Sequence, residues 1–171
     1  GTIPPVAVRP SRRPPQPESL PMPTVMPQPL RDLVRDIFAN AGSSPAEAER
    51  IARYLVEANL TGHDSHGVSR VLRYVNWKED GSIIPDQNPD IITETPVYAV
   101  VDGKFGYGQT VTPFAVRLGI EKCKAMGLAA IGLRNAGHIG RVGDWAEMAA
   151  AEGLVSIHFV NVTGSVLVAP F

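Results

Sequence analysis

Hydrophobic residues recur at spacings of three and four from residue 30 onward, which is the pattern of amphipathic helices. The first predicted helix ends at Gly42. The second starts at Ser44 and Pro45, a capped start, and ends at 61–62. A third is expected from Ser65 or Gly67 to Lys78. The inward faces of these three helices are predicted to carry Leu30, Leu33, Val34, Ile37 and Phe38; Ala48, Ile51, Ala52, Leu55 and Val56; and Val68, Val71, Leu72 and Val75.

From residue 82 the pattern changes to short apolar runs that alternate with helical segments. Strands are expected at 91–93 and 97–101, and buried strands at 128–133 and 154–160. Helices are expected at 111–126 and at 144–152, the latter with Asp144 and Glu147 as a capping box. The sequence therefore predicts an α/β fold: N-terminal helices followed by an α/β layer with a mixed sheet.

Three segments follow from this pattern. Residues 1–29 hold ten of the 16 prolines and few large apolar groups, which indicates an extended arm. Residues 30–81 form a helical segment, and residues 82–171 form the first part of an α/β domain. The apolar run 166–171 has no closing helix after it, which suggests that the chain is a fragment of something longer.

Composition narrows the class of protein. With 44% hydrophobic residues the chain can bury a core, and a net charge of −1 argues against a nucleic-acid binder. No apolar run is long enough to span a membrane, and no secretory signal is visible. Cys123 is the only cysteine, so no disulfide framework forms within the chain. We expect a soluble, cytoplasmic protein.

The segment from Gly62 to Arg70 is the richest in chemistry, because it holds His63, Ser65 and His66 at a junction between helices. An arginine can bind a carboxylate in bidentate fashion, while a histidine exchanges a proton with the adjacent oxygen. Arg70 and His66, with Ser65 to orient them, therefore suit a 2-oxo or 2-hydroxy acid. A plain polar helix cap remains an alternative reading of the same residues.

Two other chemistries compete for these residues. His63 and His66 with Asp64 could bind a metal, but their spacing lacks the pattern of zinc hydrolases. Ser65 and His138 with an aspartate could form a hydrolase triad, although no nucleophile elbow surrounds Ser65.

A second candidate site lies at 135–143, between a predicted strand and a predicted helix. Its glycines let the backbone approach a flat ring or a phosphate, and His138 would point into that space. The alternative is a crossover loop whose histidine bonds only locally. The loop 103–108 reverses the order of the dinucleotide fingerprint, so we interpret it as a structural turn. Cys123 and His158 are predicted to be packing residues.

These motifs resemble the type-2 malate/L-lactate dehydrogenase family, which includes ureidoglycolate, sulfolactate and hydroxycarboxylate dehydrogenases. The resemblance rests on Gly62–Arg70 with Arg73-Tyr74, and on the two glycine loops that follow in order, and it runs from Leu30 to Phe171. It covers only the N-terminal half of such proteins. It implies a non-Rossmann fold that binds NAD or NADP. It also implies a homodimer, and a companion chain is one way in which the missing half could be supplied.

The resemblance also implies roles for single residues. His138, or His66 with Ser65 as its partner, would act as the catalytic acid and base. Arg70, Tyr74 and His66 would bind the substrate. The coenzyme would contact His138, Ile139, Gly140, Arg141 and Val142, and no metal is implied.

Two departures leave the substrate and the coenzyme open. Ile139 stands where many members have an aromatic residue, and Arg141 and Val142 replace small residues, as in the hydroxycarboxylate branch. The leading hypothesis is hydride transfer between NAD(P)H and C2 of a small 2-oxo/2-hydroxy acid. The alternative is a non-catalytic assembly or binding subunit that another chain completes. Nucleic-acid and membrane partners are not expected.

Overall fold

The computed structural model describes residues 24–161. The expectations for most of the proline-rich arm and for the run 166–171 lie outside these residues. Helix α1 spans Pro27–Asn40, so the end of the predicted arm is helical. Proline at the first turn explains this, because that position needs no backbone N–H.

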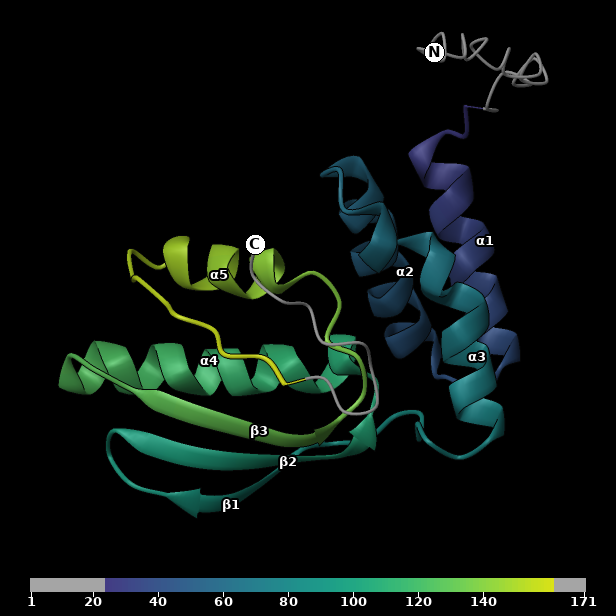
Figure 1. Ribbon diagram of the computed structural model, residues 1–171. Helices are drawn as coiled ribbons and strands as arrows, with labels where there is room; N and C mark the ends of the chain where they lie inside the picture. The colour runs from purple at the N-terminus through teal and green to yellow at the C-terminus, as the bar shows by residue number, and fades with distance from the viewer. Residues whose placement is uncertain (1–23, 162–171) are drawn as a thin grey trace, which may run out of the picture.

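Helices α1, α2 and α3 pack together on one side of the molecule (Figure 1). Helix α2 (Pro45–Leu60) begins where expected, and the Ser44 side chain accepts a hydrogen bond from the Glu47 amide. Helix α3 (Val71–Glu79) is shorter than predicted. The segment before it forms two 3-10 turns instead, η1 (Asp64–His66) and η2 (Val68–Arg70), held by side-chain contacts described below.

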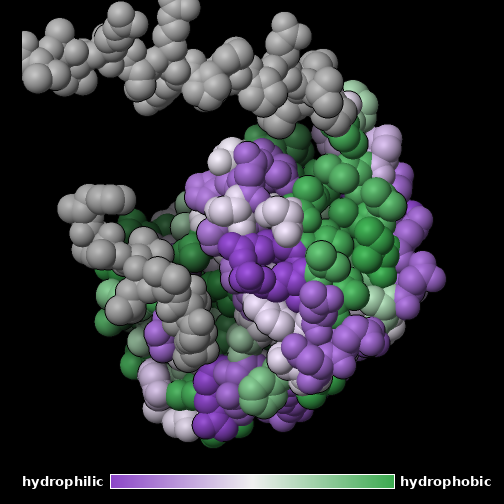
Figure 2. Space-filling model, turned by 45° about the vertical axis from the view of Figure 1, so that its right-hand side comes forward, coloured by the Kyte–Doolittle hydropathy of each residue, from purple (hydrophilic) through white to green (hydrophobic). Residues whose placement is uncertain are grey.

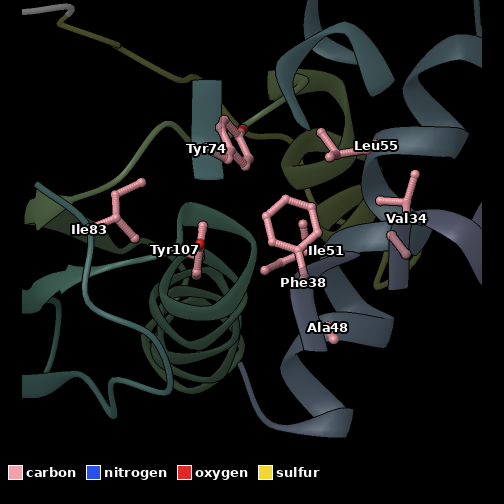
Figure 3. Close-up of a cluster of buried hydrophobic side chains, with 9 residues drawn as sticks. Val34, Phe38, Ala48, Ile51, Leu55, Tyr74, Ile83 and Tyr107 are labelled. Carbon is pink, nitrogen blue, oxygen red and sulfur yellow. The ribbon is translucent and has the colours of Figure 1, made fainter. Parts of the chain in front are cut away.

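The hydrophobic core lies where these helices meet the next part of the chain. Phe38 packs edge-on against Tyr74 and Tyr107, with ring centroids 6.3 and 5.6 Å apart. Figure 3 shows these rings converging with aliphatic side chains from α1 and α2, and with Ile83. All five predicted inward residues of α2 are buried, as expected.

The predicted inward face of α3 is wrong at one position. Leu72 is 71% exposed, whereas Tyr74 is fully buried, because the 3-10 turns shift the face that α3 presents to the core. Figure 2 shows a broad hydrophobic area beside hydrophilic residues on the side of the molecule that carries helices α1, α2 and α3. Leu33, predicted to point inward, is also exposed.

The sheet is mixed and has the strand order β1-β2-β3. Strand β1 (Asp90–Glu94) pairs antiparallel with β2 (Tyr98–Gly106), and β2 pairs parallel with β3 (Ala130–Ala136). Helix α4 (Gly108–Met126) connects the parallel pair and crosses one face of the sheet, and α5 (Val142–Ala150) lies on α4 (Figure 1). The expected α/β architecture is therefore confirmed.

Several predicted boundaries need correction. Strand β2 continues through the segment expected to be a loop, although its pairing is interrupted between Asp102 and Gly106, where Lys104 and Phe105 have positive φ. Helix α4 starts at Gly108 rather than at 111. Strand β3 starts at Ala130, and none of its residues is fully buried.

The last described segment also differs from the prediction. Residues 154–160 form no strand, and Val155 and Phe159 are 96% and 93% exposed. His158 is exposed as well and bonds to Ser156. An apolar run predicts burial, because apolar side chains tend to lie inside proteins. In the described part of the chain, no other residue covers these side chains.

The predicted capping box of α5 is wrong. The helix begins at Val142, so Asp144 lies inside the first turn, and its carboxylate accepts a hydrogen bond from the Arg141 side chain rather than from a backbone amide. Among residues 24–161, no helix is both long and apolar enough to cross a membrane.

Candidate functional site

Asn59 at the end of α2 holds the first histidine motif in place. Its side-chain oxygen accepts the Val68 amide at 2.8 Å, and its side-chain nitrogen donates to Asp64 at 2.6 Å. Gly67 makes this possible, because a Cβ there would lie 2.1 Å from the Asn59 oxygen. The two 3-10 turns are therefore fixed by contacts with α2, and they fix Ser65, His66 and Arg70 in turn.

The second motif reaches the same place from β3. Gly108, the first residue of α4, lies against the loop between β3 and α5, and a Cβ at Gly108 would lie 2.3 Å from the carbonyl oxygen of His138. Only glycine allows this approach. The loop therefore seats His138 against α3 and the start of α4.

The structure brings His66 and His138 together, although 72 positions separate them in the chain. Their rings are stacked, with centroids 5.2 Å apart and planes inclined by 28°. Ser65 Oγ lies 2.8 Å from His66 Nδ1. The Arg70 Nε donates to the Ser65 carbonyl at 2.5 Å, which holds the guanidinium beside the imidazole pair.

Tyr74 lies behind His138 rather than in an open pocket. Its hydroxyl oxygen is 2.7 Å from His138 Nδ1, and it accepts a hydrogen bond from Gln109 Nε2 at 3.0 Å. Tyr74 and Gln109 are both fully buried. The expectation that Tyr74 binds substrate stays a prediction; the structure shows its hydroxyl in contact with His138.

Burial is the main cause of the pKa shifts in this site. Desolvation lowers the pKa of His138 to about 4, with Arg70, His66 and Arg73 adding repulsion. Desolvation, then Arg70 and His63, also lower the pKa of His66. Burial raises the pKa of Tyr74 to about 12. At neutral pH the site therefore presents neutral imidazole next to a cationic arginine.

The stretch expected to contact a coenzyme is partly engaged within the protein. Arg141 is paired with Asp144 at 2.6 Å and with Glu147 at 2.8 Å. The Ile139 carbonyl accepts the Trp145 indole N–H at 3.1 Å. Gly140 is buried, and its amide donates to His138 Nδ1 at 3.2 Å. His138, Ile139 and Val142 stay half-buried.

The competing chemistries receive no geometric support. Within residues 24–161, no three His, Cys, Asp or Glu side chains are grouped to hold a metal ion. Ser65 bonds to His66 and not to His138, and the side-chain partner of His138 Nδ1 is a tyrosine rather than an aspartate. A Ser-His-Asp triad therefore does not form.

Gln109 is the functional candidate that sequence reasoning missed. It follows the glycine loop that was interpreted as a structural turn, and it lies in the buried first turns of α4 beside Val111 and Thr112. A large polar side chain on a mostly apolar helix face was the available signal. Two surface hollows elsewhere are lined by other residues, with neither histidine in their walls.

Comparisons with known proteins identify the family of the chain. The family model described as malate/L-lactate dehydrogenase matches residues 25–171. Hydroxycarboxylate dehydrogenase B of Escherichia coli K12 is 42% identical over 144 residues, which is 84% of this chain and 40% of that protein. The L-sulfolactate dehydrogenase of Methanocaldococcus jannaschii is 33% identical over 135 residues, 79% of this chain and 39% of that protein. The chain thus spans about two-fifths of the length of these relatives.

Solved structures share the fold. Malate dehydrogenase from Pyrococcus horikoshii OT3 superposes with a TM-score of 0.72 at 36% identity, over 75% of this chain and 37% of that one. A Δ1-piperideine-2-carboxylate reductase from Pseudomonas syringae superposes with a TM-score of 0.69 at 28% identity, over 77% and 40% of the two chains. Since both the family model and the relatives cover most of the chain, this protein belongs to the malate/L-lactate dehydrogenase family.

Proposed function

We propose that these residues form the acid-binding and proton-handling part of an NAD(P)-dependent 2-hydroxyacid dehydrogenase. The observation that carries the proposal is the convergence of Arg70, His66 and His138 from two distant segments. The names of the relatives, which are malate, sulfolactate and hydroxycarboxylate dehydrogenases, support the same reaction class.

Arg70 binds the carboxylate of the acid in this proposal. A guanidinium offers two parallel N–H donors that match the two carboxylate oxygens, and its charge is permanent. Its Nε donates to the Ser65 carbonyl, so in this proposal the two terminal nitrogens bind the carboxylate. Arg73 adds positive potential nearby, which favours anionic substrates.

His138 and His66 handle the proton at the substrate oxygen. In the reducing direction the C2 carbonyl gains a hydride at carbon and a proton at oxygen; in the oxidising direction both leave. An imidazole can give a proton to the oxygen when it is charged and take it back when it is neutral, and the negative charge of a bound acid favours the charged form of rings whose pKa is otherwise lowered. Ser65 orients His66 through the contact with Nδ1.

The residues present fit a nicotinamide coenzyme at the β3–α5 loop. Helix α5 has no side-chain cap at its N-terminus; the Asp144 amide is bonded to the Arg141 carbonyl, which leaves the amides of Val142 and Gly143 for an anionic group. The stacked imidazoles offer a flat neighbour for a ring. The nicotinamide would supply or accept the hydride at C2 of the acid. The guanidinium of Arg141 is already paired with acidic side chains, so we do not assign it to a coenzyme phosphate.

The experiment is coenzyme oxidation by the protein with NADH and with NADPH, against a panel of 2-oxo acids. Turnover is expected, and Arg70→Lys should raise the KM for the acid at least tenfold, because lysine lacks the planar fork. Arg35→Lys, on the exposed surface of α1, is the matched control and should change nothing. An unchanged KM in Arg70→Lys would exclude the carboxylate role.

A second pair of variants decides between the histidines. His138→Ala should lower kcat by about 10²–10⁴ if His138 transfers the proton. A loss below tenfold, together with a large loss in His66→Ala, would assign that step to His66. Absence of turnover with every acid and both coenzymes would contradict the proposed function for this chain.

A further inference from the structure

The Nδ1 atom of His138 lies against two hydrogen-bonding groups. The Gly140 amide lies 3.2 Å from Nδ1, and the Tyr74 hydroxyl lies 2.7 Å from the same atom. A backbone amide can only donate. Nδ1 therefore accepts from Gly140 in this arrangement, which disfavours a hydrogen on Nδ1 itself.

The Tyr74 hydroxyl has one hydrogen and two lone pairs. A group that donates to its oxygen therefore determines where the Tyr74 hydrogen can point. Gln109 Nε2 donates to the hydroxyl oxygen at 3.0 Å. The hydrogen of Tyr74 is then free to point toward Nδ1, with the His138 carbonyl at 3.3 Å as the other acceptor within reach. Gln109 thus decides which way the tyrosine donates.

We propose that Gln109 and Tyr74 act as positioning residues that hold His138 in its Nε2–H tautomer. In the protein without ligand, the ring then presents an N–H on its open side that can hydrogen-bond to the carbonyl oxygen of a 2-oxo acid. The effect of this tautomer on turnover rests on the proposed function. The tautomer itself does not depend on that function.

Further contacts support this arrangement. Gly140 has φ of +72°, a conformation in which its amide is held toward the ring, and a Cβ at Gly140 would lie 3.0 Å from Gln109 Nε2. The loop and the glutamine therefore fix one another. The lowered pKa of His138 agrees with this arrangement, because a low pKa means a neutral ring at neutral pH, and two donors at Nδ1 suit a neutral ring better than a charged one.

Among the described residues, Nδ1 has no hydrogen-bond partner other than the Tyr74 hydroxyl and the Gly140 amide. Gln109 Oε1 itself has no hydrogen-bond partner among the described residues. If the Gln109 amide were turned over, Oε1 would accept from Tyr74, and Nδ1 would have to donate. That arrangement would set the Gly140 N–H against an N–H on the ring, which is repulsive. The backbone amide therefore selects between the two orientations.

The test is long-range proton–nitrogen NMR on the ¹⁵N-labelled protein without coenzyme, at neutral pH. This measurement distinguishes a protonated ring nitrogen from an unprotonated one. The chain has four histidines, and loss of one signal set in His138→Gln identifies the ring of interest. The wild-type ring should show hydrogen on Nε2 alone. Hydrogen on Nδ1 would overturn the proposal.

Two variants test the named residues. In Tyr74→Phe and in Gln109→Leu, the ratio of the two tautomers should shift about fivefold or more toward Nδ1–H, since one hydrogen bond that favoured Nε2–H is lost. The double variant, Tyr74→Phe with Gln109→Leu, leaves no buried donor without a partner. It replaces the single variants in the test if one of them folds poorly. Unchanged tautomer ratios in these variants would mean that Gly140 alone fixes the ring, and would overturn the role of Gln109 and Tyr74.

The matched control is Thr112→Val. Thr112 is also a buried polar residue of α4, and its hydroxyl has no partner in the structure, so the tautomer ratio should stay as in the wild type. In activity assays Gln109→Leu should lower kcat tenfold or more and leave the KM for the acid unchanged, because Arg70 is untouched. A correct tautomer in a protein without turnover would overturn only the proposed function, whereas turnover with a mixed wild-type tautomer would overturn only this inference.

Discussion

His138 shows how the surroundings of one residue alter its chemistry. In water a histidine changes charge near pH 6.5, so it would be partly charged in a neutral solution. Here burial, and the positive charge of Arg70, lower its pKa to about 4. A neutral ring beside an arginine leaves the arginine as the cation that meets the acid, and the ring as its hydrogen-bonding neighbour.

This shift predicts how stability depends on pH. Between pH 6.5 and about 4 the unfolded chain binds a proton at His138 that the folded chain does not. Lowering the pH through that window should therefore reduce the free energy of unfolding, by about 1–3 kcal/mol for a half-buried ring. Urea unfolding at a series of pH values measures it.

His138→Gln is the control for this dependence. His66, whose pKa is also lowered, acts in the same direction, whereas Asp144, whose pKa burial raises, acts in the opposite one. The difference between the wild type and His138→Gln isolates the single residue. Equal slopes in the two proteins between pH 4 and 6.5 would contradict the assigned shift.

The residue scale is also where sequence reasoning was least complete. Arg70 and His66 could be named from their chemistry within one short segment, whereas the acid/base role of His138 was implied by the family resemblance. The burial of Tyr74 and its bond to His138 could not be predicted, since the two residues are 64 positions apart. Gln109 was overlooked because an amide carries no charge and has no distinctive spacing.

At the scale of elements, local signals worked where one element defines its own surroundings. Helix α2 starts with the predicted Ser44 cap and buries the predicted face. Signals failed where a second element decides the outcome. The two 3-10 turns replace a helix start because Asn59, on α2, takes the Val68 amide, and the apolar residues 154–160 remain exposed because no described element covers them.

The Asn59 contact gives a prediction for the η1–η2 segment. Gly67→Ala should lower the free energy of unfolding by about 2–4 kcal/mol, because the added methyl group displaces Asn59 from the Val68 amide and from Asp64. Gly62→Ala is the matched control, since Gly62 has φ of +80° but no atom within 4 Å of the added carbon. It should cost only backbone strain, about 1–2 kcal/mol.

Urea unfolding of the two alanine variants measures this difference. Equal losses in Gly67→Ala and Gly62→Ala would show that Asn59 moves aside freely, and that the two 3-10 turns do not depend on it.

At the scale of the whole molecule, the helical segment and the α/β layer are joined rather than merely adjacent. Ile83 and Tyr107, which follow the helical segment in the sequence, belong to the same core as Phe38 and Leu55 (Figure 3). The division at residues 81–82 therefore describes the sequence pattern, and the site lies where the two parts meet. Tyr74 comes from one part, while Gln109 and His138 come from the other.

Glu47 is the polar counterpart of this shared core. It is only 1% exposed, and its two carboxylate oxygens accept from the Asp86 amide at 2.8 Å and from the Thr110 hydroxyl at 2.7 Å. The first partner lies in the connection between the two parts, and the second lies on α4. Because one side chain of α2 satisfies donors from both, it couples the two parts during unfolding.

Glu47→Ala should therefore destabilise the whole protein and not one part of it. Two donors lose their acceptor, and we expect a loss of about 2–4 kcal/mol within a single unfolding transition. Glu49→Ala is the matched control, because Glu49 is exposed and lies 4.0 Å from Arg35, a contact worth less than about 1 kcal/mol. Thermal unfolding followed by circular dichroism and by tryptophan fluorescence reports both parts, since Trp77 lies on α3 and Trp145 on α5. Coincident transitions shifted to lower temperature in Glu47→Ala are expected; separate transitions in the wild type, or equal shifts in the two variants, would show that Glu47 does not join the two parts.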